Sequence, residues 1–591
     1  MKGFMKMVGA TVVGLAMWSI VAFMFTMIAM GSIIASEDNP VVEEGSILRI
    51  KLSGELSERA EESPIAFLTG GEEGLALDNI LMAIDKAAQD DNVKGIYLEG
   101  GALAGSPAMI QELRQAIVKF KQSKKFVWAY GDTYTQGSYY VCSAADQLYL
   151  NPEGIVDWHG LSAELMFYTD VMKKLGVKMQ VFKVGSFKSA VEPYINTEMS
   201  EANREQVTSY LNSIWNNMLQ DVALSRKLTT DKLNALADSM TTFMPAKQLL
   251  EAKMVDKLCY KDEVRSLLKS KMGLDSDESL TFVEPGTMAK VNTVSRKVKD
   301  CIAVYYAYGD IVDDNTSDLS GGMVGNIAPE PMNKELDRLM NDDDIKAVVI
   351  RVNSGGGSAY ASEQIWRQVS LLKQKKPVVI SMGGMAASGG YYISCNASRI
   401  VAEPTTLTGS IGIFGMFPDM SELLTDKIGL HYDNVKTNKR GDFGTTSRPV
   451  NEEEGRMIQA HVERGYDLFT RRVAEGRKME QDSVKVIGEG RVWTGEQALK
   501  IGLVDELGDM QVAIKAAAKL AKTDDYLVDY YPAQKSWFES LFDDGSMSPD
   551  YMESQLKATL GEYYGIFKQV KNIKNASRIQ AAMPYKLIIN N

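Results

Sequence analysis

The chain contains much the same sequence twice, at an offset of about 252 residues. Gln136–Tyr140 reads QGSYY and Ser388–Tyr392 reads SGGYY, and Lys94 recurs as Lys346 at the same offset. A repeat of this length is a duplicated domain, because the units of solenoid proteins are several times shorter. With 591 residues, the chain is also too long for one hydrophobic core. It is therefore expected to fold as two related halves.

Each half follows the same alternation of strands and helices. A charged turn leads into an apolar strand, Val93–Leu98 in the first half and Ala347–Val352 in the second. A loop of small residues and an amphipathic helix follow in each half, and a second strand comes after the helix. Strands that alternate with helices form crossover units, which indicate an α/β fold with mostly parallel sheets.

Composition divides the chain into four parts. Residues 1–36 are predicted to form a membrane anchor, 37–295 the first repeat, 296–537 the second repeat and 538–591 a tail. The boundary between the repeats falls near residues 284–300, in a polar stretch with a Pro-Gly pair that is typical of a linker. The tail is expected to be mostly helical, and its sequence assigns it no function.

The amino terminus has the length and polarity of one transmembrane helix. No charged side chain occurs from Met7 to Ser36, and a helix needs about 20 apolar residues to cross a bilayer core. Lys2 and Lys6 precede this run and acidic residues follow it, so the positive-inside rule places the amino end in the cytoplasm. The sequence predicts a single-pass protein of the inner membrane with its body periplasmic or otherwise extracytoplasmic. A long cleaved signal peptide is the alternative.

Charge and composition exclude several classes of partner and cofactor. A formal net charge of −12 argues against a nucleic-acid partner, which would require a basic face. The four cysteines have no metal-ligand spacing and occur mainly in apolar stretches, so buried thiols are expected. The sequence therefore predicts neither a metal nor another cofactor.

The two halves differ at the positions where chemistry would occur. Ser410, in the segment TGSIG, stands where the first half has Trp158. Lys188, in the segment GSFKS, stands where the second half has Arg440. One half keeps a serine and the other a lysine, which predicts one composite active site in each chain.

A serine hydroxyl needs a neighbouring base before it can attack a carbonyl group. Of the three histidines, His159 lies in the half that lacks Ser410, and the other two occur in surface-like segments. Lys188 is the better candidate, because burial without an acidic partner would lower its pKa and leave the amine neutral. Arg440 could not replace it, since a guanidinium group does not lose its proton in proteins.

Two glycine-rich loops add the remaining candidates. Gly356 and Gly357 follow an apolar strand and are candidate N–H donors for an oxyanion hole. A phosphate-binding loop is the alternative there, although no Lys-Ser or Lys-Thr pair follows. In the second loop, Ser388 is the rival nucleophile, and Met382 and Met385 are predicted to line a pocket for an apolar side chain.

Several longer motifs occur together and in one order, and together they resemble the signal peptide peptidase A family, also called protease IV, in its long duplicated form. The resemblance covers essentially the whole chain. The motifs are FKSAVEPY at 187–194, RVNSGGG at 351–357, MAASGGYY at 385–392, TLTGSIGIFG at 406–415 and GRVWTG at 490–495.

The resemblance implies a Ser/Lys dyad, with Ser410 as nucleophile and Lys188 as general base. It also implies a fold similar to the Clp protease and crotonase group, and homotetramers with a bowl-like apolar interior. The implied substrates are apolar peptides, the remnant signal peptides left in the membrane. Gly355 departs from the proline that the family often has in its Asn-Ser-x-Gly-Gly loop, which leaves the backbone donors in place.

The sequence thus predicts a membrane-anchored serine endopeptidase that degrades cleaved signal peptides. Two other classes stay open at this point. One is a crotonase-like enzyme that would hold an acyl-thioester enolate with its glycine loops, and the other is an inactive membrane scaffold. The predicted anchor and the absence of a clear basic patch for an adenine nucleotide count against the crotonase-like enzyme.

Overall fold

The computed structural model describes residue 18 and residues 40–59, 74–291, 298–313, 326–533 and 579–582. The uncharged segment that is predicted to cross the membrane lies, apart from Trp18, outside these residues. Within the described ranges, no helix is both long enough and apolar enough to cross a bilayer.

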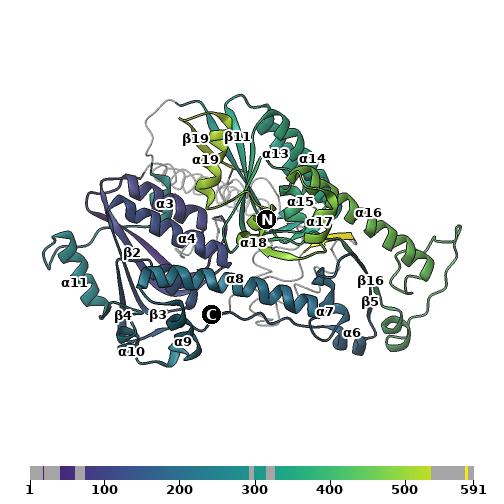
Figure 1. The fold of residues 1–591 in the computed structure, drawn as a ribbon, viewed down its shortest axis with the longest axis horizontal. Coiled ribbons are helices and arrows are strands. Elements are labelled where there is room, and N and C mark those ends of the chain that lie inside the picture. The colour runs from purple at the N-terminus through teal and green to yellow at the C-terminus, as the bar shows by residue number, and fades with distance from the viewer. Residues whose placement is uncertain are drawn as a thin grey trace, which may run out of the picture.

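The first half is built around a parallel sheet with helices packed against it (Figure 1). Its strand order is β6-β4-β3-β2-β1-β7, and every pair of neighbouring strands is parallel. Helices α3, α4 and α5 connect the successive strands from β1 to β4. The bounds are β1 Ser46–Glu55, β2 Val93–Ala104, β3 Phe126–Tyr134, β4 Gln147–Val156, β6 Lys257–Leu258, β7 Phe282–Val283, α3 Leu77–Gln89, α4 Pro107–Phe120 and α5 Gln136–Cys142.

The second half repeats this strand order as β18-β14-β13-β11-β8-β19, again with parallel neighbours. A further strand, β15, continues along β13 and pairs antiparallel with β17. The predicted α/β class, the mostly parallel sheets and the duplication are confirmed. The bounds are β8 Cys301–Tyr308, β11 Ile345–Ser354, β13 Val378–Ala387, β14 Arg399–Ala402, β15 Leu407–Gly409, β17 Val492–Thr494, β18 Glu506–Leu507, β19 Leu527–Tyr531, α13 Pro329–Asn341, α14 Ala359–Lys375 and α15 Gly389–Ser394.

A third sheet joins strands from both halves. Its order is β10-β9-β12-β20-β16-β5, and β5 of the first half pairs antiparallel with β16 of the second. Strand β20 comes from the tail, of which the structure describes residues 579–582. The bounds are β5 Lys178–Lys183, β9 Asp310–Ile311, β10 Asn326–Ile327, β12 Gly356–Ser358, β16 Phe414–Asp419 and β20 Ile579–Ala582.

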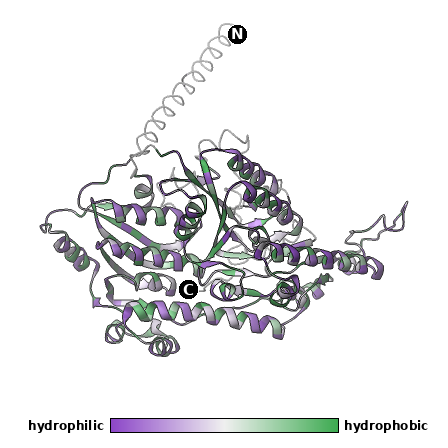
Figure 2. Ribbon diagram, turned by 45° about the horizontal axis from the view of Figure 1, so that its top comes forward, coloured by the Kyte–Doolittle hydropathy of each residue, from purple (hydrophilic) through white to green (hydrophobic). Residues whose placement is uncertain are grey.

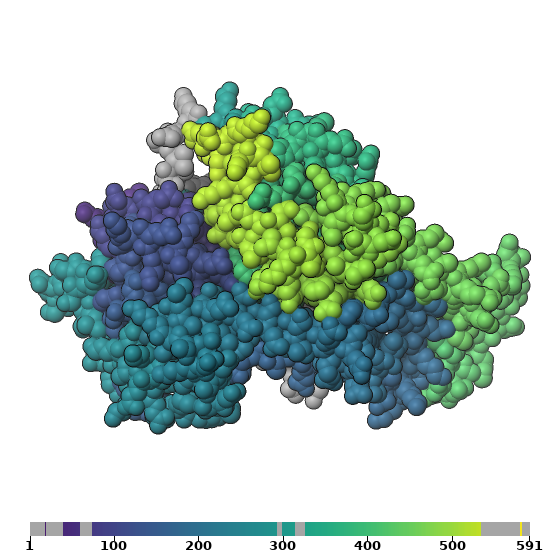
Figure 3. Space-filling view, viewed as in Figure 1, coloured from purple at the N-terminus to yellow at the C-terminus, as the bar shows by residue number. Residues whose placement is uncertain are grey.

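The long helix α8, Glu201–Arg226, also ties the halves together. Figures 1 and 3 show this part of the chain running from beneath the second half to beneath the first. The Ser213 hydroxyl lies 2.8 Å from the Thr494 hydroxyl. Hydrogen bonds between side chains of α8 and side chains of β17 and the following helix α18, Gly495–Lys500, hold the first half against the second.

Each half has its own apolar core, and the two cores meet. Figure 2 shows hydrophobic residues along the strands and hydrophilic residues alternating with them on the flanking helices, as expected of helices with one buried face. Leu407 and Val492 of the second half are buried within the core cluster of the first. The contact between the halves is therefore partly a continuous hydrophobic core.

A buried ionic cluster lies at the same contact. Arg351, on β11 of the second half, bonds to Glu58 at 3.0 Å and to Glu112 on α4 at 2.6 Å. All three side chains are at most 4% exposed. The guanidinium also donates to the Ser381 hydroxyl at 3.1 Å, and Glu112 accepts from the Met510 N–H at 3.0 Å. The positive charge of Arg351 therefore balances the negative charges of two carboxylates that come from the first repeat.

Replacing Arg351 with methionine is expected to lower the free energy of unfolding by about 3–5 kcal/mol, because Glu58 and Glu112 lose their buried counter-charge. The urea unfolding midpoint of the purified full chain measures this loss. The matched control is Arg399→Met, which breaks an exposed pair with Glu506 and is expected to change stability by less than about 1 kcal/mol. Equal midpoints for the two variants would contradict a stabilising role for the buried cluster.

Candidate active site

The loop after β5 carries Lys188 from the first half into the second. The Phe187 N–H donates to the Glu489 carbonyl at 3.0 Å. Gly490 has a φ of +80°, and a methyl group there would lie 2.6 Å from the Lys188 Cβ. Only glycine fits this contact, because both the backbone conformation and the close approach exclude a side chain. The Lys188 side chain is consequently held inside the second half, with 0% exposure.

Ser388 stands at a sharp turn between β13 and α15. Its φ of 55° and ψ of −114° are a strained combination for a residue with a side chain. The Ser388 N–H donates to the Gly409 carbonyl at 2.8 Å, which fixes the turn against β15. A strained strand-to-helix turn of this type presents the hydroxyl of a nucleophilic serine in other hydrolases.

Ser410 follows β15 directly and also has a positive φ, of 49°. Its N–H donates to the Arg491 carbonyl at 2.7 Å, so the loop before β17 holds it in place. Both serines are buried, with exposures of 0% for Ser388 and 1% for Ser410.

The lysine amine lies between the two serine hydroxyls. Lys188 Nζ is 2.7 Å from the Ser388 Oγ, 3.1 Å from the Ser410 Oγ and 3.2 Å from the Ser410 carbonyl oxygen. Burial lowers the pKa of Lys188 to about 7, because desolvation disfavours the ammonium form. A large fraction of the amine is therefore neutral near pH 7 and can accept a proton. The structure thus brings Lys188 within hydrogen-bond distance of both serines that the sequence analysis considered, and the rival Ser388 is the nearer of the two.

One of the two predicted oxyanion glycines, Gly356, lies beside the turn that carries Ser388, whereas Gly357 lies against Ile311. A methyl group on Gly356 would collide with the Ala581 carbonyl oxygen and lie 2.5 Å from the Gly389 nitrogen. The Gly356 N–H, however, already donates to the Ser354 hydroxyl at 3.1 Å. Gly389 is the first residue of α15, so its N–H has no acceptor within the helix. The sequence interpretation missed this donor, although its position directly after a strand-to-helix serine was a signal for it.

Met382 and Met385 were predicted to line a substrate pocket. Met382 is 1% exposed and belongs to the core cluster of the second half. Met385 is partly buried and packs against the core cluster of the first half. Met382 is thus surrounded by core side chains, and Met385 lies at the contact between the repeats.

In the described part of the first half, other residues stand at the positions that match this cluster. Trp158, which stands at the position of Ser410, is 0% exposed, and its indole N–H donates to the Leu233 carbonyl at 3.1 Å. Its ring packs edge-on against Tyr139 at 5.6 Å. Arg440, at the position of Lys188, is paired with Glu453. Aromatic packing and an ion pair therefore occupy the two positions that would form a second site.

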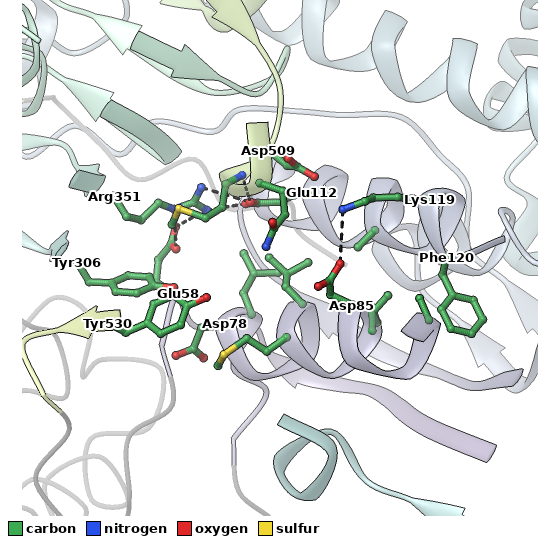
Figure 4. A pocket seen from close by; sticks show the side chains of 18 of the residues that line it. Glu58, Asp78, Asp85, Glu112, Lys119, Phe120, Tyr306, Arg351, Asp509 and Tyr530 are labelled. Carbon is green, nitrogen blue, oxygen red and sulfur yellow. Dashed lines mark hydrogen bonds and ion pairs between the residues drawn. The ribbon is translucent and has the colours of Figure 1, made fainter. Parts of the chain in front are cut away.

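A cavity of about 220 Å³ lies elsewhere, between the two repeats. Figure 4 shows Tyr306 and Tyr530 at one end of it, near Glu58, and an ion pair between Lys119 and Asp85 at the other. Lys188, Ser388 and Ser410 are not among the residues that line this cavity. Its lining includes no serine beside a buried lysine, so the lysine–serine cluster is the candidate active site.

Known relatives are consistent with this chemistry. Protease 4 of Salmonella typhi is 36% identical over 503 residues, which cover 82% of this chain and 79% of the relative. Protease 4 of Haemophilus influenzae is 33% identical over 512 residues, covering 81% of this chain and 80% of the relative. The chloroplastic serine protease SPPA of Arabidopsis thaliana is 31% identical over 485 residues, covering 81% of this chain and 70% of the relative.

The sequence profile of peptidase family S49 matches the chain twice, at residues 119–275 and 370–524. The protein is a serine endopeptidase. It belongs to peptidase family S49, and the predicted resemblance to signal peptide peptidase A in its duplicated form is confirmed. Among solved structures, a ClpP1 variant from Listeria monocytogenes is 15% identical over 36% of this chain and 95% of that chain, with a TM-score of 0.24, which is too low to compare the folds.

Proposed function

We propose that the protein is a membrane-anchored endopeptidase that cleaves apolar peptides with Ser388 as nucleophile and Lys188 as general base. The observation that carries this proposal is the distance of 2.7 Å between the Lys188 Nζ and the Ser388 Oγ, in a site that lowers the lysine pKa to about 7. Ser410, which the sequence interpretation named as nucleophile, becomes a positioning residue for the lysine.

Three features favour Ser388 over Ser410. Its hydroxyl is the nearer of the two to Lys188 Nζ, at 2.7 Å against 3.1 Å. It directly precedes α15, so that the N–H of the next residue, Gly389, is available beside it. Ser410 contacts the amine through both its hydroxyl and its carbonyl oxygen, which suits a residue that orients Lys188.

The proposed reaction is an acyl transfer in two stages. Neutral Lys188 takes the proton of the Ser388 hydroxyl as its oxygen attacks the peptide carbonyl carbon. The ammonium then gives the proton to the leaving amine as the C–N bond breaks. Water, deprotonated by the same lysine, hydrolyses the acyl-serine. The N–H groups of Gly389 and Gly357 are the proposed donors to the oxyanion, because the Gly356 N–H is taken by the Ser354 hydroxyl.

The proposed substrates are remnant signal peptides. One relative, from Enterococcus faecium, is named as a putative signal peptide peptidase and is 35% identical over 207 residues. The uncharged segment from Met7 to Ser36 would anchor the body beside the inner membrane, on its extracytoplasmic side. An anchored enzyme meets membrane-bound peptides at a raised effective concentration.

Self-association into a homotetramer is part of the proposal. The segment between β16 and helix α16, Glu452–Arg477, exposes large apolar side chains, including Ile428, Tyr432 and Val435, the last 99% exposed. Figure 1 shows this segment projecting from one end of the molecule. Exposed apolar side chains gathered on one projecting segment are typical of a surface that another subunit covers. Sedimentation of the purified chain in detergent measures the assembly.

The value of kcat/KM for an apolar peptide is expected to rise with pH and to level off above about pH 8, because only neutral Lys188 can act as base. Below about pH 6 it should fall roughly tenfold for each pH unit, as the protonated fraction of a group with a pKa of about 7 approaches one. Stopped assays on the full chain from pH 5 to pH 9 measure the profile. Activity that is constant or decreases over this range would contradict the lysine as base, and Lys188→Arg is expected to be inactive throughout.

A further inference from the structure

A bulge in strand β13 lies just before the turn that carries Ser388. In the parallel pairing of β11 with β13, Val352 faces Met382 and Ser354 faces Ala386. One residue of β11 therefore stands opposite three residues of β13. A bulge bends its strand and re-aims the residues that follow, and bulges are over-represented next to active sites. The shape of this bulge thus sets the position of Ser388, which comes two residues after Ala386.

The side chain of Asn353 closes the gap in the ladder of hydrogen bonds. Asn353 is the residue of β11 opposite the bulge, and its Oδ1 accepts from the Met385 N–H at 3.0 Å. Its Nδ2 donates to the Glu58 Oε1 at 2.8 Å. A backbone N–H only donates and a carboxylate only accepts, so these two partners fix which way the amide faces. An amide suits this place because it offers an acceptor on one side and a donor on the other.

The carboxylate that holds the Asn353 amide comes from the first repeat. Glu58 follows β1 and is 6% exposed. It also accepts from the Arg351 guanidinium at 3.0 Å and 3.2 Å (Figure 4). At the position of Asn353, the first repeat has Gly101. Of the two matching positions, only the one in the repeat that carries both serines therefore has an amide.

The bulge packs directly against the first repeat. A methyl group on Gly383 would collide with the Glu58 Oε1 and lie 3.1 Å from the Asn353 Cβ. A methyl group on Gly384 would collide with the Ser106 hydroxyl oxygen. Glu58 and Ser106 both belong to the first repeat, so that repeat confines the bulge at two consecutive residues. The docking of the repeats is therefore linked to the shape of the strand that leads to the nucleophile turn.

We propose that Asn353 and Glu58 are positioning residues for the turn that carries the nucleophile. The Glu58 carboxylate holds the Asn353 amide, and the amide holds the Met385 N–H. The bulge fixed in this way places the Ser388 hydroxyl within reach of the Lys188 amine. This inference rests on the proposed function, in which Ser388 is the nucleophile. The first repeat then contributes to the site twice, once with the base and once through the backbone of the strand that carries the hydroxyl.

The test exchanges the amide and the carboxylate in the full chain in detergent. Asn353→Asp places two carboxylates face to face and is expected to lower kcat for an apolar peptide about 100-fold, because a small displacement of a reacting group costs this much. KM should change by less than about threefold, and the pH midpoint should stay that of the wild type, because the surroundings of Lys188 are unchanged. Asn353→Asp combined with Glu58→Gln again sets a donor against an acceptor, and is expected to recover kcat to within about tenfold of the wild type.

Two further variants separate positioning from a general loss of stability. Asn217→Asp also breaks an amide–carboxylate hydrogen bond between the repeats, in which the Asn217 Nδ2 donates to the Glu496 Oε2 at 3.1 Å. This bond joins α8 to α18, so kcat should stay within about twofold of the wild type. Asn353→Gly introduces the residue of the first repeat and removes both hydrogen bonds without adding a charge. It carries the same expected loss as Asn353→Asp, so the test stands even if Asn353→Asp does not fold.

Labelling by a fluorophosphonate keeps the outcomes apart. In the two Asn353 variants, the rate of labelling at Ser388 should fall together with kcat. Folded Asn353 variants that label and turn over at the wild-type rate would overturn this inference and leave the proposed function standing. A double variant as impaired as Asn353→Asp alone would also overturn it. Label found on Ser410 and not on Ser388 in the wild type would overturn the proposed nucleophile and this inference together.

Discussion

Replacing Ser388 with alanine is expected to lower kcat/KM for an apolar peptide by about 10⁴-fold or more, because the acyl-enzyme cannot form without its nucleophile. Ser410→Ala is expected to cost about 10- to 100-fold, since Lys188 loses one hydrogen bond but keeps its contact with Ser388. The pH midpoint of the remaining activity should also shift in Ser410→Ala, because the surroundings of the amine change. Steady-state kinetics on the three full-length proteins measure both effects.

Covalent labelling decides between the two serines without relying on rates. A fluorophosphonate should modify Ser388 in the wild type and in Ser410→Ala, and should not react with Ser388→Ala. Ser394→Ala is the matched control, because Ser394 is a buried serine on the same helix whose hydroxyl donates to the Gly390 carbonyl at 2.6 Å. Label recovered on Ser410 in the Ser388→Ala protein would return the role of nucleophile to Ser410.

Lys188→Met is expected to abolish peptide cleavage and at the same time to stabilise the fold. The lysine has a pKa of about 7 in the folded protein, against 10.5 as its ordinary value. At neutral pH, burying the amine therefore disfavours folding by about 4 kcal/mol, a cost that methionine does not incur. Loss of the lysine's hydrogen bonds offsets part of this gain, so the thermal midpoint should rise by a few degrees.

The sign of the pH dependence gives a second check on Lys188. Between pH 7 and pH 10.5 the unfolded chain binds more protons at this residue than the folded chain does. Wild-type stability therefore gains from this residue as pH rises through that window, and the advantage of Lys188→Met should shrink accordingly. Thermal unfolding at pH 7 and pH 9 measures the difference. A methionine variant less stable than the wild type at pH 7 would contradict a buried amine with a lowered pKa.

Much of the architecture could be predicted from the sequence, because duplication and hydrophobic periodicity are local signals. The alternation of apolar strands with helices predicted two parallel sheets, and the sheets share one strand order. The loss of serine at Trp158 and of lysine at Arg440 predicted a composite cluster of Lys188 and Ser410, and their side chains lie 3.1 Å apart. The informative signal for these site residues was the difference between the two copies. It marked positions where the residue type in the second copy is not explained by packing alone.

The choice between the two serines could not be predicted in this way. It depends on a backbone conformation at Ser388 and on the N–H of Gly389, and neither is visible in residue types. The mixed sheet was also missed, since β12 and β20 are short and are separated by more than 200 residues of sequence. Pairing between such distant segments is set by tertiary packing rather than by local pattern.

The division of the site between the repeats has a consequence during synthesis. A ribosome that has completed only the first repeat has made Lys188 but neither Ser388 nor Ser410. With the roles proposed above, the emerging chain holds a base without an alcohol to activate. Proteolytic competence arises only after the second repeat has folded around the loop that carries Lys188, so the order of translation itself delays the enzyme until its scaffold is complete.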